Sequence, residues 1–91
     1  MSSLTIWIEH KNSYRLATEL VLTLQETKAL VNPVSAPQTN NSITTLDIPD
    51  LQHDARERII TETSNWANTK GLESIPTEST QDSEACNLTI R

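Results

Sequence analysis

Four side chains that could bind a divalent cation lie close together in the 91-residue chain: Asp50, His53, Asp54 and Glu57. On a helix, their offsets of three, four and seven residues would place them on one face. Carboxylate and imidazole groups can together bind a divalent metal, so a metal-responsive domain is one hypothesis. The commoner explanation is a solvated acidic face, in which acids near the start of a helix stabilise its dipole without an ion.

The sequence does not carry the pattern of an enzyme. The spacing His-x3-Glu lacks the second histidine that makes zinc-protease motifs specific. His10 follows the first apolar segment, but neither a nucleophile nor an orienting partner for it can be identified. Gly71 is the only glycine, which excludes the glycine-rich loops that bind phosphates and dinucleotides. We therefore expect a non-enzymatic protein without a cofactor.

The charge balance disfavours nucleic acid as a partner. Twelve acidic and seven basic residues give a formal net charge of −5, which repels phosphate backbones. One alternative remains, a dimeric transcriptional regulator whose basic patch forms on association from Arg56 and Arg58. The lone Cys86 cannot form an intrachain disulfide, and no apolar stretch approaches the roughly 20 residues that span a bilayer. These features predict a soluble cytoplasmic protein.

Two segments near the N-terminus predict a strand followed by a helix. Residues 4–9 alternate, with Leu4, Ile6 and Ile8 facing one side and Trp7 the other, as in a β-strand. A helix is expected over residues 13–31, because good helix formers dominate there and leucines recur four residues apart. An alternative is that apolar residues at even positions continue as a second strand, which would make residues 4–24 a hairpin.

A second helix is expected at residues 49–70, with Pro49 in its first turn, Asp47 and Asp50 near its positive end, and Gly71 as its terminator. Residues 32–46 contain Pro33 and Pro37 and predict a linker. Residues 72–91 are rich in Glu, Ser and Thr and predict a flexible acidic tail. The expected fold is thus a small α+β domain over residues 1–71, with one strand and two amphipathic helices.

The predicted function follows from what this architecture leaves incomplete. A single strand needs a neighbour for its backbone hydrogen bonds, and the chain has few large apolar side chains, so a second copy or another protein should complete the fold. The residues expected to bind this partner are Trp7, Ile6 and Ile8 on the strand, and Ile59 and Trp66 on the second helix. We expect a small protein–protein interaction module, such as an adaptor, regulator or inhibitor, acting as a homodimer or with another protein.

Overall fold

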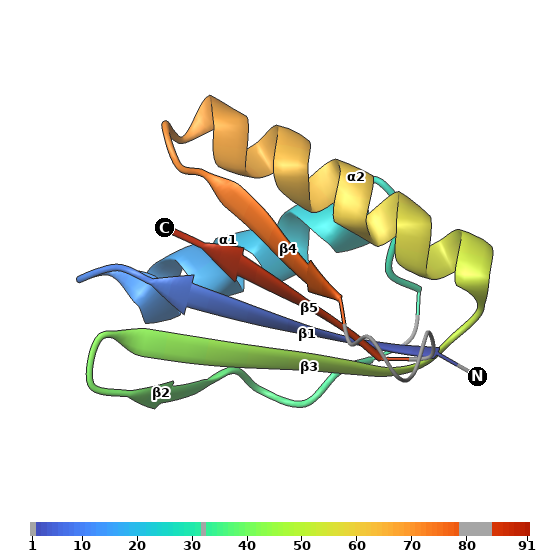
Figure 1. Ribbon diagram of the computed structural model, residues 1–91, viewed down its shortest axis with the longest axis horizontal. Helices are drawn as coiled ribbons and strands as arrows, with labels where there is room; N and C mark the ends of the chain where they lie inside the picture. Colours follow the sequence, from blue (N-terminus) through green and yellow to red (C-terminus); the bar gives the residue numbers. More distant parts are fainter. Residues whose placement is uncertain (1, 32, 79–84) are drawn as a thin grey trace.

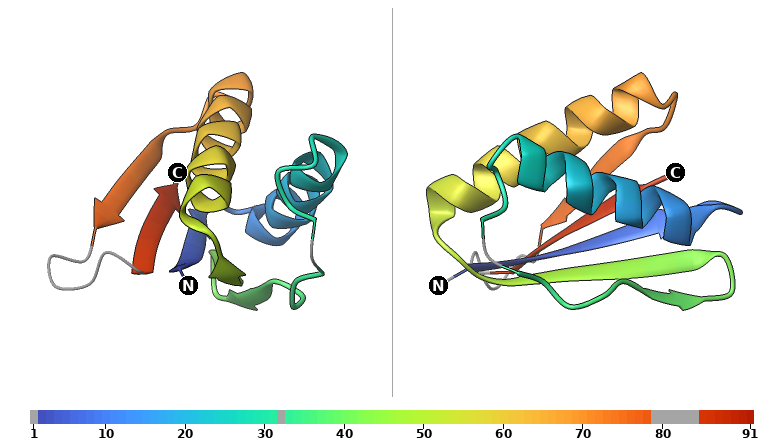
Figure 2. Two further views of the ribbon diagram at one scale, coloured as in Figure 1. Left: turned by 90° about the vertical axis from the view of Figure 1, so that its right-hand side faces the viewer. Right: turned by 180° about the vertical axis from the view of Figure 1, so that it is seen from behind.

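Two helices cover one face of a five-stranded β-sheet (Figure 1), and both lie on the same side of it (Figure 2, left view). The computed structural model describes residues 2–31, 33–78 and 85–91. The elements follow in the order β1 (Ser2–Glu9), α1 (Ser13–Glu26), β2 (Gln38–Asn40), β3 (Ile43–Leu51), α2 (His53–Thr69), β4 (Ser74–Glu78) and β5 (Ala85–Ile90). The strand order in the sheet is β2-β3-β1-β5-β4. The expected α+β class with two helices is confirmed.

Strand β1 occupies the centre of the sheet. It pairs with β3 in an antiparallel register and with β5 in a parallel register. Both edges of β1 are therefore paired within the chain, and the prediction that this strand needs another molecule for its ladder is wrong. Its alternation is as expected, because Leu4, Ile6 and Ile8 are buried beneath the helices.

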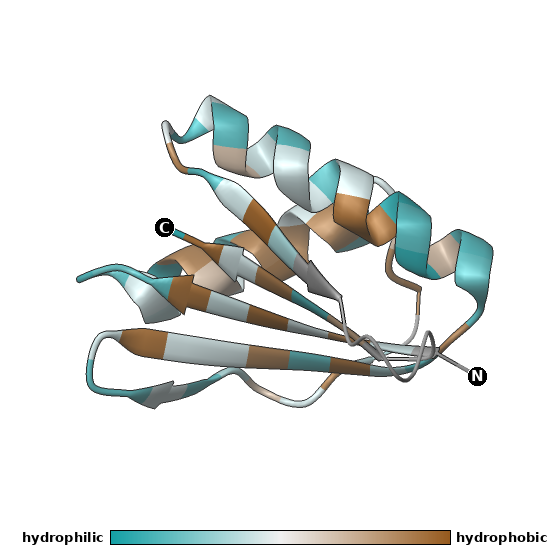
Figure 3. Ribbon diagram, viewed as in Figure 1, coloured by the Kyte–Doolittle hydropathy of each residue, from teal (hydrophilic) through white to brown (hydrophobic). Residues whose placement is uncertain are grey.

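The expected linker contains two strands. Within residues 32–46, β2 forms and β3 begins, although Asn32 itself lies outside the described residues. The pattern that builds β3 is the alternation of buried Thr44, Leu46 and Ile48 with outward-facing neighbours. In hydropathy the strand alternates only in its second half, after a long stretch of intermediate residues (Figure 3). Hydrophobic burial against the helices outweighs the turn-forming composition of this segment.

The expected acidic tail also contains two strands. Strands β4 and β5 form an antiparallel pair, and β5 places Leu88 and Ile90 in the core beside β1. The prediction of a flexible tail is therefore wrong for residues 74–78 and 85–90, while residues 79–84 lie outside the described residues. The composition of residues 72–91 as a whole is polar, and this conceals the short apolar alternation at Leu88 and Ile90.

Helix α1 forms as predicted, which rejects the hairpin alternative for residues 4–24. It ends at Glu26, five residues before the expected end at 31. Lys28 adopts a left-handed conformation with φ of 62°, and the chain then turns so that Ala29 and Leu30 are buried. Burial of these two side chains in the core favours the early end over another helical turn.

Helix α2 begins at His53, so Pro49 and Asp50 belong to β3 and not to a first helical turn. The register of β1 against β3 is irregular there, and Asp50 has a φ of 58°. A proline is tolerated at such a bulge because its position needs no ladder donor. The helix ends at Thr69, one residue before the expected end at 70. Gly71 follows as the predicted terminator, and its φ of 73° allows its amide and that of Leu72 to donate to the carbonyls of Asn68 and Ala67.

A short chain of hydroxyl groups connects α1 to the β2–β3 hairpin. The buried Thr44 donates to the Ser13 hydroxyl oxygen at 2.7 Å, and the Thr39 and Thr44 hydroxyls are 2.8 Å apart. Ser13 is the first residue of α1, and the preceding Asn12 makes no side-chain capping hydrogen bond. The three hydroxyls satisfy one another across α1, β2 and β3, which fixes the hairpin against the start of the helix.

Replacing Leu88 by Ala should lower the free energy of unfolding by about 2–5 kcal/mol, because it empties a fully buried site in β5. Urea denaturation followed by circular dichroism measures the loss. The matched control is Thr89→Ala, one residue further on the opposite face, for which we expect a change of about 1 kcal/mol or less. Equal effects of the two substitutions would contradict the position of β5 in the core.

Replacing Thr44 by Val should destabilise the fold by about 1–2 kcal/mol, although the side-chain volume hardly changes. The substitution removes the donor to Ser13 and leaves that buried hydroxyl unsatisfied. Thermal denaturation of the variant beside Thr45→Val, which changes the next residue on the other face, measures the difference. A Thr44→Val protein as stable as its control would show that the hydroxyl chain contributes nothing.

Candidate functional site

The face of the sheet turned away from the helices is uncovered, and we refer to it as the open face. Every second residue of the central strands points to it: Ser3, Thr5, Trp7 and Glu9 from β1, Ile43, Thr45 and Asp47 from β3, and Asn87 and Thr89 from β5. Most of these side chains are uncharged, and several are β-branched or aromatic. Such a surface can be removed from water at lower cost than one covered with charges.

Trp7 lies at the middle of the open face. Its neighbours across the ladder are Thr45 on β3 and Thr89 on β5, and 36% of its surface remains exposed. The Trp7 side chain, on the central strand β1, thus lies between two shorter side chains on the neighbouring strands β3 and β5. A large, rigid aromatic group in such a position loses little conformational entropy when another surface covers it.

Two polar contacts show how the charged groups of the open face are arranged. The Thr5 hydroxyl donates to Asp47 Oδ1 at 2.9 Å, and Arg91 Nη1 lies 3.8 Å from Glu9 Oε2. These four side chains flank Trp7, because Thr5 and Glu9 lie two residues to either side of it on β1. The sequence placed Asp47 near the start of the second helix and Arg91 in a flexible tail, and neither prediction holds. Their position beside Trp7 depends on the pairing of β3 and β5 with β1.

The other four residues expected to bind a partner are in the core. Ile6, Ile8 and Ile59 are fully buried, and Trp66 is 6% exposed. They pack α2 and β1 together within the chain, so no partner can reach them while the protein is folded. Of the expected partner-binding residues, Trp7 alone is on the surface.

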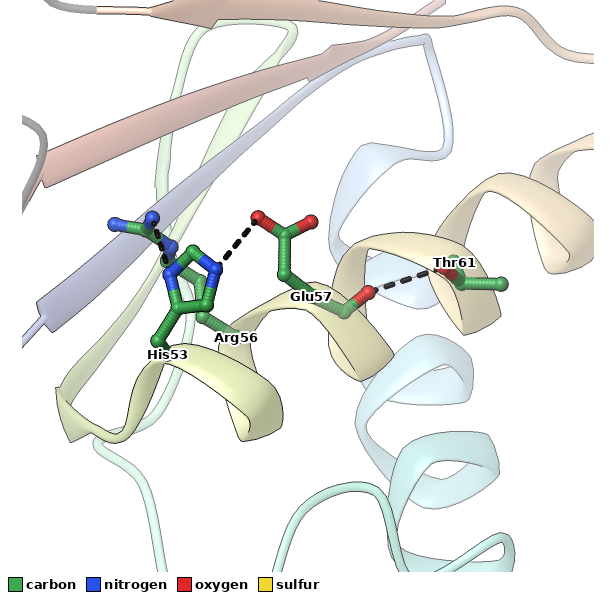
Figure 4. Close-up of polar contacts among 4 residues, drawn as sticks. All are labelled: His53, Arg56, Glu57 and Thr61. Atoms are coloured by element: carbon green, nitrogen blue, oxygen red, sulfur yellow. Dashed lines mark hydrogen bonds and ion pairs between the residues drawn. The ribbon is translucent and has the colours of Figure 1, made fainter.

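The acidic segment does not form the cluster expected for a metal site. Asp50 belongs to β3, so it does not share a helix face with the other three residues. His53 Nε2 lies 3.9 Å from Glu57 Oε1, and its Nδ1 lies 3.3 Å from Arg56 Nη2 (Figure 4). Among the residues that the structure describes, no group of three or more His, Cys, Asp or Glu could hold a metal ion.

The candidate residues for a basic patch and for catalysis have structural roles. Arg56 is buried on the inner side of α2, and Arg58 donates to the Thr27 carbonyl oxygen at 2.7 Å at the end of α1. His10 accepts a hydrogen bond from the Asn12 amide through Nδ1, in the turn between β1 and α1. With Arg56 buried, this pair cannot form the surface patch expected of a DNA-binding dimer.

A hollow lies between the end of α1, the end of β3 and the start of α2. Its volume is about 610 Å³, and the aliphatic side chains of Leu30, Val34 and Leu51 line it together with Asp50 and Gln52. The volume and apolar lining are within the range of small-molecule sites. Nothing in the sequence marks this cleft, because it depends on how the chain turns after the early end of α1.

Comparison with known proteins gave no match to a protein-family model, to a curated protein or to a solved structure. Neither helix in the described part of the chain is both long enough and apolar enough to span a bilayer.

The two tryptophans should differ sharply in their exposure to solvent. At low protein concentration, a Trp66→Phe variant reports Trp7 alone and should show red-shifted fluorescence that acrylamide quenches readily. A Trp7→Phe variant reports Trp66 and should emit at shorter wavelength with several-fold weaker quenching. Equal quenching of the two variants would contradict the assignment of Trp7 to the surface and Trp66 to the core.

Proposed function

We propose that this protein is a small non-enzymatic protein–protein interaction module that binds its partner through the open face of the sheet. Trp7 is the anchor, and the residues that flank it on β3 and β5 form the surrounding contact surface. Under this proposal the protein acts in the cytoplasm as an adaptor, regulator or inhibitor.

The observation that carries this proposal is the exposure of Trp7 at the centre of a largely uncharged sheet face. In two-layer folds, apolar residues that face the core alternate along each strand with polar residues that face water, so the open sheet face is usually polar and well solvated. Here the central row consists of Trp7 between Thr45 and Thr89, and the charges lie further out. An uncharged centre with an aromatic residue, surrounded by a charged rim, is the arrangement typical of protein interfaces.

A catalytic or metal-dependent role has less support from the histidines and from the cleft beside Leu51. The His53–Glu57 pair is two residues on an exposed helix face, and His10 serves a turn. The cleft beside Leu51 brings one carboxylate and one amide to an aliphatic wall. Acid–base or nucleophilic chemistry needs a nucleophile, a base and an orienting group within hydrogen-bond reach of one another.

A photo-crosslinking amino acid placed at Thr45 tests this proposal in cells that express the protein. Position 45 lies on the open face beside Trp7, so we expect a discrete crosslinked species that disappears when Trp7→Ala is added. The control position is Thr18, which is exposed on α1. A second control, Tyr14→Ala, removes an aromatic side chain that is 53% exposed on the same helix and should leave the Thr45 crosslink intact.

Two results would reject the open face as the interaction surface. One is a Thr45 probe that forms no discrete species. The other is a crosslink at Thr45 that persists in Trp7→Ala while circular dichroism shows that the variant is folded.

A further inference from the structure

Asp47 and Arg91 lie on opposite sides of Trp7 across the open face. Asp47 is on β3, level with Thr5, and Arg91 follows β5, level with Glu9. Strands are about 4.8 Å apart, and residues two apart on one strand are separated by about 6.8 Å. Each charge is therefore displaced from Trp7 by about 8 Å, in opposite directions and with opposite sign.

This placement is complementary to itself. A two-fold axis can lie in the plane of a face-to-face interface, pass through Trp7 and run perpendicular to the line from Asp47 to Arg91. Rotation about that axis places Arg91 of each copy opposite Asp47 of the other, and the two copies of Trp7 meet at the centre. An isologous interface requires this reciprocity, in which each contact occurs twice.

We propose that the open face binds a second copy of this chain, in a two-fold dimer held by the paired Trp7 side chains and by two reciprocal Arg91–Asp47 ion pairs. The inference rests on the proposed function of the open face and specifies its partner. The strands of the two sheets cross at a steep angle in this arrangement, which belongs to the orthogonal class of sheet packing.

The charged groups remain satisfied in the dimer. Arg91 is close to Glu9 within its own chain, and a guanidinium group has five N–H donors, so it can bond Glu9 and the second copy's Asp47 together. Asp47 uses one oxygen for the Thr5 hydroxyl and has its other oxygen available to that guanidinium. Glu9 comes to lie opposite Thr45 of the second copy and beside its Asp47, so the Arg91 guanidinium lies between the two carboxylates.

The area of the open face reaches the lower limit for a specific pair. Five strands at about 4.8 Å spacing and a strand length of about 20 Å give a flat footprint of about 480 Å² for each copy. Two copies therefore cover about 1,000 Å² before the relief of the side chains is added. Specific interfaces begin at about this size.

Sedimentation velocity of two charge-reversal variants, Arg91→Asp and Asp47→Arg, tests the dimer geometry. We expect the wild-type protein to dimerise with rising concentration. Each variant alone places like charges opposite one another twice, and its dissociation constant should rise at least about tenfold. An equimolar mixture restores both attractive pairs, so a heterodimer should form with an affinity within about threefold of the wild type.

The recovery in the mixture also shows that both variants are folded, and circular dichroism of each confirms it. Matched controls reverse the sign of exposed charges on the helices, Arg15→Asp on α1 and Asp54→Arg on α2. Neither control, alone or mixed, should change the dissociation constant. Added salt should weaken the recovery in the charge-reversal mixture, since ionic screening acts on the pairs that it restores.

Three outcomes would overturn the dimer: a wild-type protein that stays monomeric at every concentration, a dimer unaffected by either reversal, or variants that fail to recover when mixed. A monomeric protein whose Thr45 probe still crosslinks a different polypeptide in a Trp7-dependent manner would refute the dimer alone. A monomeric protein without any Thr45 crosslink would refute both the dimer and the proposed function.

Discussion

The pairing of β1 on both of its edges is the constraint on which the rest of the structure depends. Antiparallel β3 and parallel β5 satisfy the backbone groups of this strand, and in doing so they align Leu46 and Leu88 with Ile6 in one buried row. Both helices pack on that row, because it is the apolar surface that the sheet presents. A strand pair formed between segments about 80 residues apart thus determines where each helix must lie.

The same register determines the opposite surface. Successive side chains along a strand point to opposite faces of the sheet, so the residues next to a buried side chain must face away from the core. Trp7 lies between the buried Ile6 and Ile8, and it must therefore face outward on the central strand with Thr45 and Thr89 beside it. The open face and the core are consequences of one register, and a shift by one residue would exchange them.

Local periodicity predicted some elements and composition concealed others. Both helices and β1 could be predicted, because their apolar spacing repeats over many residues or alternates strongly. Strand β3 was missed because Thr44 serves as a core residue through its hydrogen bond to Ser13, which no hydropathy pattern reveals. Strand β5 was missed because its apolar residues are few and its partner is distant in sequence. The same holds for the candidate site. The outward position of Trp7 could be predicted from β1 alone, whereas the positions of Asp47 and Arg91 beside it depend on the strand pairing.

The most direct test of the account is a dilution series of two-dimensional NMR spectra of the uniformly labelled wild-type protein. If the open face associates, the amide signals of Thr5, Thr45 and Thr89 and the indole signal of Trp7 should move with concentration. The signals of exposed residues on α1 and α2 should stay fixed. Concentration-dependent shifts confined to the helices, or none anywhere in the spectrum, would contradict the assignment of the open face as the surface through which two copies of this chain associate.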